Sequence, residues 1–207
     1  MRSGRRRGAR TSQKVRALLA AGVVVGLGAA STLAAWTDQE NASASLTAGT
    51  FGIVGSVDGT TFTEHPNQTP AQLAFSVPAN ALLPGSVVHA KFAVQTTDES
   101  AAGVARLAAD PGNVPADGSG LGGFLTYGVS QIEGDTCDLA AFSEGTIIVP
   151  RGSALTISPA AGVTQALAAD GDSPVTYCFE VTLPTTASND AQGRSATPRW
   201  TVNAENT

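Results

Sequence analysis

The fold is decided by the stretch Val175-Thr-Tyr-Cys-Phe-Glu-Val-Thr-Leu183. Large apolar side chains occupy every second position from Val175, and Thr, Cys and Glu occupy the positions between them. Successive side chains of a strand point to opposite faces of a sheet, so this spacing predicts a strand that buries one face. Residues 87–97 alternate in the same way, and one face of that stretch carries Val88, Ala90, Phe92 and Val94.

Shorter strands are expected along the rest of the chain, separated by Gly, Pro and Asp turns. They cover about residues 46–57, 61–65, 73–77, 104–109, 125–132, 146–149 and 198–203. A helical turn is expected at 138–142, and residues 160–169 fit a loop, a strand or a helical turn. About eight short strands between turn signals predict an all-β fold, a jelly-roll-like antiparallel β-sandwich. We expect residues 46–207 to form this single domain.

A basic and then apolar leader precedes the domain. Seven of the 12 basic residues lie before residue 17, and residues 17–35 are apolar or small. This order predicts a helical secretory signal peptide over residues 1–34, with a basic region 1–16 and an apolar region 17–34. Small residues place the cleavage site at Ala34 or Ala35. The alternative is that the apolar run is not cleaved and stays as a membrane anchor, because it is just long enough to span a bilayer. The membrane is expected as a partner only through this uncleaved segment.

The remainder of the chain is acidic. All 17 acidic residues lie at or beyond Asp38, where only five basic residues remain. Nucleic-acid binding needs clustered Lys and Arg, so nucleic acid is not expected as a partner. The negative charge would keep a secreted monomer soluble and could attract cations or a basic partner surface.

Cys137 and Cys178 are the two cysteines, and both follow the leader. An even count in an exported chain predicts a disulfide between them. The bridge would close a loop of about 42 residues and stabilise the fold by roughly 4 kcal/mol in the loop-entropy model. The alternative, a reactive thiol, requires a CxxC motif or a neighbouring histidine, and the sequence has neither.

No catalytic constellation is found, and neither an enzymatic activity nor a cofactor is predicted. His65 and His89 are the two histidines, and neither has the spacing of a metal-ligand motif. His89 falls on the polar face of its strand beside Lys91, which predicts a solvated histidine.

One loop offers oxygen ligands of the kind that calcium prefers, namely Asp110, Asn113 and Asp117. The loop departs from the twelve-residue calcium-binding pattern, because it lacks the closing Glu. Turn formation is the simpler explanation for these three side chains, and no metal site is predicted.

The leader junction resembles a known family. The run Thr32-Leu-Ala-Ala-Trp-Thr-Asp38, followed by Leu46-Thr-Ala-Gly-Thr-Phe51, is similar to the signal-junction motif of TasA and camelysin proteins. Leu82-Leu-Pro-Gly-Ser86 resembles a turn of that family, and Trp200-Thr-Val-Asn-Ala204 resembles its final strand. The chain departs from the family where Phe51 and Ile53 replace a Leu-Asp-Leu element, and the matches cover well under half of its length.

The resemblance implies an exported jelly-roll protein of the cell surface or biofilm matrix, released by a SipW-type signal peptidase. In TasA-like fibres the segment after the cleavage site leaves its own domain and adds as a strand to the next subunit. Residues 35–45 are a polar arm with little to anchor it in its own core, and residues 46–57 could pair with an open sheet edge. The expected assembly residues are Trp36, Asp38, Leu46, Ala48, Gly49, Thr50 and Phe51.

Self-association, or association with another surface or matrix protein, is therefore the expected interaction. Three alternatives stay open. In the first alternative, the arm is a plain spacer before the first strand of a monomer. In the second, the protein is a monomeric binding module in which Trp36 and Trp200 stack on carbohydrate. The third alternative is a camelysin-like metallopeptidase, for which two isolated histidines provide no zinc site.

Overall fold

The computed structural model describes residues 14–20, 39–45, 48–76 and 82–207. The chain divides into two units, Met1–Leu46 and Thr47–Thr207. In the first unit, residues 14–20 are helical and residues 39–45 are exposed without regular structure. Within the described ranges, no helix has the length and apolar character needed to cross a membrane. The rest of the predicted signal peptide and its cleavage site lie outside the described residues.

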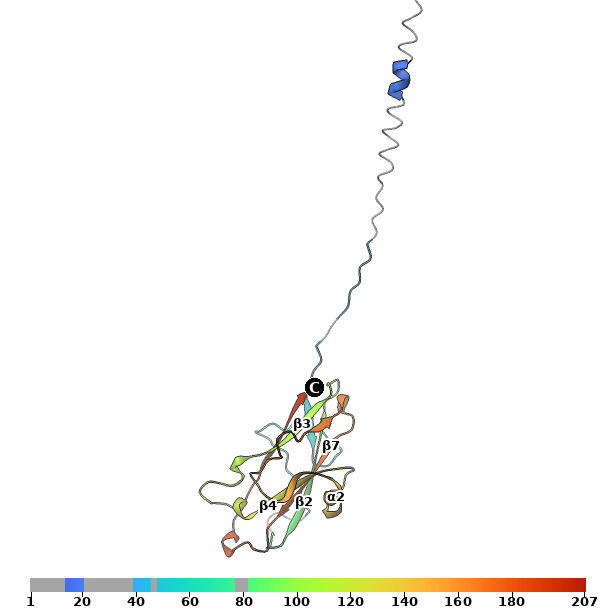
Figure 1. Cartoon of the computed structure of the whole chain (residues 1–207). Coiled ribbons are helices and arrows are strands. Elements are labelled where there is room, and N and C mark those ends of the chain that lie inside the picture. Colours follow the sequence, from blue (N-terminus) through green and yellow to red (C-terminus); the bar gives the residue numbers. More distant parts are fainter. Residues whose placement is uncertain (1–13, 21–38, 46–47, 77–81) are drawn as a thin grey trace, which may run out of the picture. The chain divides into compact units, whose positions relative to one another are not determined.

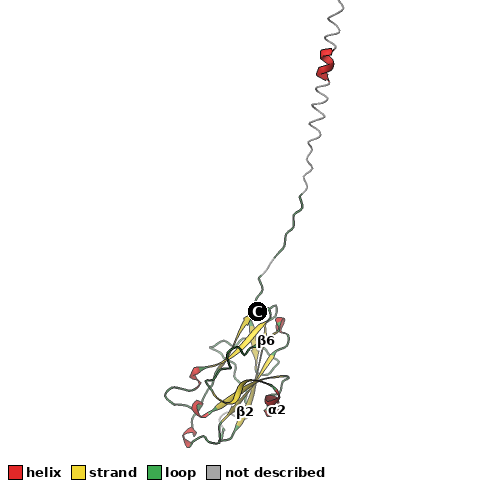
Figure 2. Ribbon diagram, viewed as in Figure 1, coloured by secondary structure: helices red, strands yellow, loops and turns green. Residues whose placement is uncertain are grey.

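The second unit is a sandwich of two antiparallel sheets, shown in Figures 1 and 2. The five-stranded sheet has the order β1 (Ile53–Ser56), β2 (Val87–Thr96), β7 (Val175–Thr182), β4 (Thr126–Ile132), β5 (Thr146–Ala154). The three-stranded sheet has the order β6 (Gln165–Leu167), β3 (Gly103–Ala109), β8 (Trp200–Asn206). The short helix α2 (Leu139–Glu144) packs on β4, β5 and β7. The all-β sandwich prediction is confirmed.

Four single turns of 3-10 helix complete the described elements of this unit. They are η1 (Pro111–Asn113), η2 (Gly122–Phe124), η3 (Ala169–Gly171) and η4 (Asn189–Ala191). All of them lie in connections between strands, where short polar or glycine-containing stretches interrupt the alternating pattern.

The strand order is that of a jelly roll with one departure. In an eight-stranded jelly roll the two sheets have the orders 1-8-3-6 and 2-7-4-5. Here β2-β7-β4-β5 and β8-β3-β6 follow these orders, whereas β1 pairs with β2 instead of β8. Among the described residues, the place beside β8 that belongs to the first strand of a jelly roll holds no strand.

The core lies between the two sheets. Its largest fully buried side chains are Tyr127, Tyr177 and Phe179, and the Trp200 ring of β8 lies 4.9 Å from that of Phe179. The inward face of β7 is apolar, as predicted. Its outward face, which the alternation predicted to be solvated, is buried as well, because α2 and the segment bridged to Cys178 cover it.

The first predicted strand is shorter in the structure. β1 starts at Ile53, because Thr50 and Gly52 bond to the loop ahead of β3 instead of extending the strand. In the predicted strand 61–65, the structure has a single β-bridge, between Thr63 and Gly55. In the described part of the predicted strand 73–77, the Ser76 amide donates to the His89 carbonyl, but no strand forms. Pro66 and Pro70 lack the backbone N–H that a continuous ladder requires.

Other strand limits also differ from the prediction. β5 continues through Pro150 to Ala154 instead of ending at residue 149. Proline is tolerated there because β5 is an edge strand of its sheet, so the missing N–H breaks no central ladder. The ambiguous stretch 160–169 contains β6, and the last strand runs to Asn206 rather than residue 203.

Candidate functional site

The residues predicted to join subunits fall into three groups. Ala34, Ala35, Trp36, Asp38 and Leu46 lie outside the described residues. Ala48 and Gly49 are exposed and belong to no strand, and the described part of the arm, residues 39–45, is exposed throughout. Thr50 and Phe51 belong to the domain, so the candidate arm is confined to residues before Thr50.

Hydrogen bonds fix the point where the chain enters the domain. Thr50 Oγ1 donates to the carbonyl of Glu99 at 3.3 Å, and the amide of Ala101 donates to the carbonyl of Thr50 at 3.2 Å. The Phe51 ring packs against Gly103, where a side chain on that glycine would collide with it. The absence of a Cβ at residue 103 therefore lets Phe51 dock at the beginning of β3.

The same end of the domain holds the end of β8. Gly103 pairs with Asn206, and the amide of Thr207 donates to the carbonyl of Ala102 at 3.4 Å. The entry point at Thr50 and the end of β8 are therefore neighbours. This shared position fixes the direction in which the chain's own preceding segment could run beside β8.

β8 is the least covered strand of the sandwich. It pairs with β3 along its whole length, and within the described part of the chain no strand pairs with its other edge. Its inward side chains, Trp200, Val202 and Ala204, are only partly buried, whereas Ala105, Leu107 and Ala109 of β3 are fully buried. The sandwich thus leaves one edge and part of its inner face open along β8.

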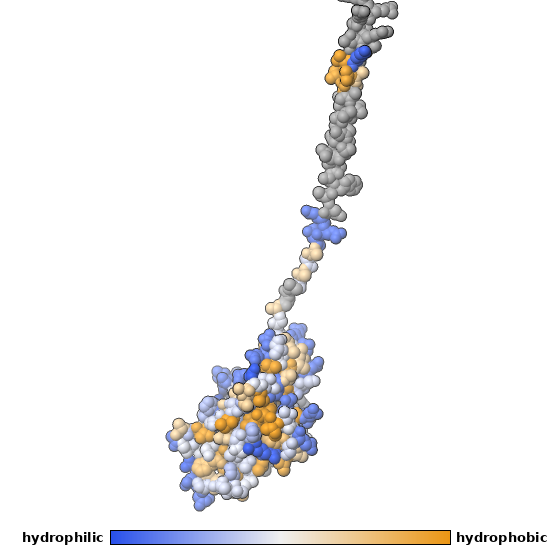
Figure 3. Space-filling model, viewed as in Figure 1, coloured by the Kyte–Doolittle hydropathy of each residue, from blue (hydrophilic) through white to orange (hydrophobic). Residues whose placement is uncertain are grey.

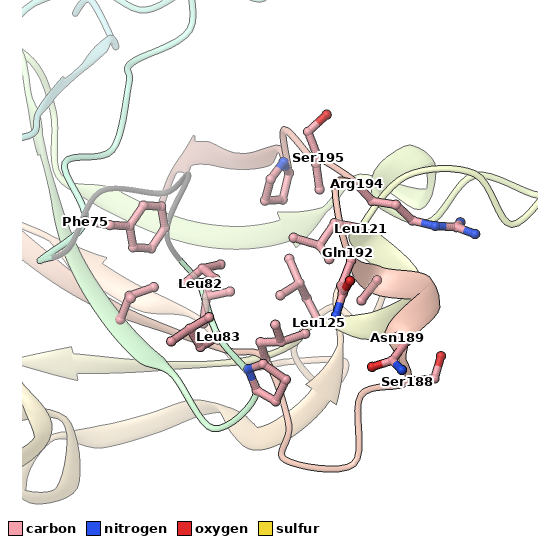
Figure 4. Close-up of a pocket in the computed structure, with 18 residues that line it drawn as sticks. Phe75, Leu82, Leu83, Leu121, Leu125, Ser188, Asn189, Gln192, Arg194 and Ser195 are labelled. Atoms are coloured by element: carbon pink, nitrogen blue, oxygen red, sulfur yellow. The ribbon is translucent and has the colours of Figure 1, made fainter.

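A groove of about 730 Å³ adjoins the beginning of β8 and is called the β8 groove below. In Figure 4, Phe75, Leu82 and Leu83 form one wall, and Leu121 and Leu125 lie at its centre. The opposite wall comes from the segment that leads into β8. It mixes the polar residues Ser188, Asn189, Gln192 and Ser195 with the apolar residues Ala191, Ala196 and Pro198.

An exposed apolar side chain lies at the β8 groove. Leu83, which lines the β8 groove, is 70% exposed. Figure 3 shows hydrophobic surface gathered among hydrophilic residues on the face of the domain in view. Exposed apolar side chains that line a groove indicate a surface suited to apolar contacts.

A second cluster lies on the outer face of the five-stranded sheet. Glu180 of β7 is 5% exposed, and its Oε1 lies 3.1 Å from Arg151 Nε in an ion pair. His89 Nε2 lies 3.1 Å from Glu180 Oε2, and the His89 side chain is 10% exposed. The prediction of a solvated His89 is therefore wrong, because cross-strand pairing places it directly opposite a buried carboxylate.

Gly128 explains how Arg151 reaches Glu180 from the edge of the sheet. Gly128 of β4 pairs with Glu180, and a Cβ at this glycine would lie 3.0 Å from Arg151 Cα and 3.0 Å from the Phe142 ring. The Arg151 guanidinium stacks over Phe142 at 4.5 Å. Because residue 128 has no side chain, Arg151 and Phe142 close over the outward face of the sheet.

The other candidate ligand residues are engaged in local bonds. Asp110 and Asp117 accept from the amides of Gly112 and Ser119, which are turn interactions. The Asn113 amide donates to the carbonyls of Leu155 and Arg199 and ties the loop to the core. Over the described ranges, no three side chains among His, Cys, Asp and Glu are grouped as a metal would require.

His65 and the cysteines complete the predicted set. The His65 and Phe92 rings form a T-shaped pair with 6.2 Å between their centroids. Cys137 and Cys178 form the predicted disulfide, with 5.3 Å between their Cα atoms. The bridge fastens the segment before α2 to the outer face of β7.

Sequence reasoning missed the Glu180–Arg151 pair and the β8 groove. A single carboxylate in the middle of the most regular strand was a signal for the pair, since a buried charge needs a partner. No signal pointed to the groove, because its walls come from four distant segments. No protein-family model matches the chain, and no curated protein matches it either.

Proposed function

We propose that the protein is an exported structural protein of a cell surface or extracellular matrix, whose subunits join into fibres by N-terminal strand addition. The observation that carries this proposal is the open edge of β8, at the position that a jelly roll gives to its first strand. A strand from another subunit would complete the sheet and cover the partly buried side chains of β8.

The other sheet edges are less suited to this role. β5 carries Pro150 and a left-handed residue at Gly152, features that discourage strand pairing. β1 has four residues and β6 has three, so both offer short ladders. β8 offers seven residues without proline or glycine, which makes it the longest regular edge among the described strands.

Chain direction favours a partner chain over the subunit's own arm. The first strand of a jelly roll runs antiparallel to the eighth. Thr50 lies at the end of β8, so a segment of the same chain leading directly into Thr50 along β8 would run parallel to it. An antiparallel strand beside β8 is therefore supplied more simply by a second subunit.

The same geometry predicts an open assembly. An antiparallel added strand ends near the beginning of the acceptor's β8, and the donor's domain follows at its own Thr50. The entry end of each domain then faces the opposite end of the next one. Such head-to-tail contacts do not close on themselves and generate filaments unless the rotation forms a ring.

Export is supported by the leader and by the disulfide. A basic region followed by an apolar run and small residues has the order of a secretory signal. The Cys137–Cys178 bridge is consistent with an oxidising, extracellular compartment. The alternative of a carbohydrate-binding module has weaker support, because the Trp200 ring is engaged with Phe179 and Tyr127.

The test uses the full chain, expressed with its own leader and recovered outside the cell. N-terminal sequencing is expected to show cleavage near Ala34 or Ala35, and negative-stain electron microscopy is expected to show filaments. Removal of residues 41–48 should abolish the filaments and leave the melting temperature of the domain unchanged. A cleaved wild-type protein that stays monomeric at high concentration would refute the proposal.

A further inference from the structure

We propose that the β8 groove binds a small uncharged amphiphile, a molecule with an aliphatic chain and one alcohol or amide head group. This inference goes beyond the proposed function, because it concerns a small molecule and not the joining of subunits. The groove has the size for such a ligand. Its volume of about 730 Å³ lies within the range of roughly 300–1,000 Å³ that small-molecule sites occupy.

The floor of the groove is made of core side chains. Val88 of β2 and Val181 of β7 come from the five-stranded sheet, and Leu121 and Leu125 come from the connection between β3 and β4. Each of these four residues is at most 8% exposed. Packing in the core therefore holds the floor in place before any ligand arrives, as is usual for small-molecule sites.

One wall of the groove is also apolar. Phe75 and Leu82 pack against the core and are partly buried, whereas Leu83 is 70% exposed. In Figure 4 these three side chains lie on one side of Leu121 and Leu125. An aliphatic chain in the groove would contact apolar side chains beneath it and along this wall, and removing both surfaces from water is favourable.

Gln192 provides a hydrogen-bonding group for the head of the ligand. In Figure 4 its side-chain amide points toward Leu121 and Leu125 at the centre of the groove. The backbone N–H of Gln192 donates to the Asn189 carbonyl and holds the residue in place, while the side chain is exposed. A side-chain amide both donates and accepts hydrogen bonds, so it matches an alcohol or another amide.

The charge of the groove selects against ionised ligands. Arg194 carries the single charge among the lining residues that the structure describes. Its Nη1 donates to the Gly118 carbonyl at 2.7 Å, and its guanidinium lies over the Phe124 ring at 5.2 Å. In Figure 4 the guanidinium points away from Leu121 and Leu125. A carboxylate or ammonium group would therefore lose its water without gaining a partner of opposite charge inside the groove.

The overall charge of the domain acts in the same direction against fatty carboxylates. All 17 acidic residues lie at or beyond Asp38, together with only five basic residues. This excess of negative charge repels anions from the surface. The uncharged lining and the acidic domain together favour a neutral head group.

The first test measures binding to the full chain by titration calorimetry with three ligands that share one aliphatic chain. The ligands are 1-octanol, octanoate and octylamine. We expect octanol to bind at least about tenfold more tightly than either charged analogue, because the groove offers neither of them a counter-charge. Octanoate or octylamine binding as tightly as octanol would overturn the inference. A wild-type protein that does not bind octanol would also overturn it and would leave the groove to a protein partner.

The second test locates the site with matched substitutions. Ala191→Trp fills the groove and should abolish octanol binding, whereas Ala160→Trp, at an exposed position that does not line the groove, should not change it. Thermal melting of the two variants shows whether the larger side chain disturbs the fold.

The head group is tested by a milder change. Gln192→Ala should weaken octanol binding about fivefold by removing one hydrogen bond, and Gln68→Ala, at an exposed position outside the groove, should have no effect. This variant decides the matter if Ala191→Trp does not fold. Octanol that binds a folded Ala191→Trp variant or Gln192→Ala as tightly as wild type would overturn the inference.

Discussion

Glu180 is the residue whose environment differs most from its expected place on a polar strand face. It is nearly fully buried, and its two oxygens face Arg151 and His89 from neighbouring strands. A buried carboxylate is tolerated only when it is paired and hydrogen-bonded. The cluster links β2, β7 and β5 across the outer face of one sheet, so it holds together the sheet opposite β8.

We expect Arg151→Met to destabilise the domain by about 2 kcal/mol, because it leaves the Glu180 carboxylate with one partner fewer. The matched control is Arg106→Met, which removes an ion pair to Glu205 whose side chains are 48% and 66% exposed. Exposed pairs contribute at most about 1 kcal/mol. Denaturant unfolding measures both, and equal losses would contradict this account of Glu180.

Tyr127 makes the stability of the domain depend on pH in the alkaline range. Its hydroxyl donates to the carbonyl of Ile157, and burial raises its pKa from 10.0 to about 12. The folded state then holds a proton that the unfolded chain releases, so stability is complete below pH 10 and falls as the pH rises towards 12. Burial also raises the pKa of Tyr177.

The expected result is a free energy of unfolding that declines above pH 10 in wild type and declines less in Tyr127→Phe. Denaturant titrations between pH 8 and pH 12 measure it. Identical slopes for the two proteins would show that Tyr127 does not carry this dependence, and Tyr177→Phe would then identify the contribution of the second tyrosine.

At the scale of elements, the sequence predicted the strands in which apolar and polar residues alternate over a long stretch. It did not predict which segments cover the outer face of these strands. β2 and β7 were predicted within one residue of their limits, because their apolar positions repeat over eight residues or more. The burial of the outer face of β7 could not be predicted. It depends on α2 and on the disulfide, which bring a distant segment over the strand.

The disulfide is expected to stabilise the layer formed by α2. Reduction of Cys137–Cys178, or the double substitution to serine, should lower the free energy of unfolding by roughly 4 kcal/mol in the loop-entropy model. Thermal melting with and without reductant measures the effect, and the double-serine variant shows whether the reductant acts elsewhere. Equal melting of oxidised and reduced protein would rule out a stabilising role for the bridge.

At the scale of the whole molecule, the arm is a prediction from the sequence, whereas the open edge of β8 is an observation from the structure. The leader junction and the polar arm were predicted from local composition, because a signal segment is a local pattern. The open edge depends on the order of strands, and the β8 groove depends on segments from residue 75 to residue 198. A single sequence does not fix which distant strands become neighbours.

The central claim is that the free edge of β8 receives a strand from another subunit. Hydrogen exchange on the full chain, compared at low and at high protein concentration, tests this claim most directly. We predict that β8 amides not bonded to β3 become protected on assembly, and that removal of residues 41–48 loses this protection. Filaments in which these amides exchange as fast as in the monomer would contradict strand addition at β8.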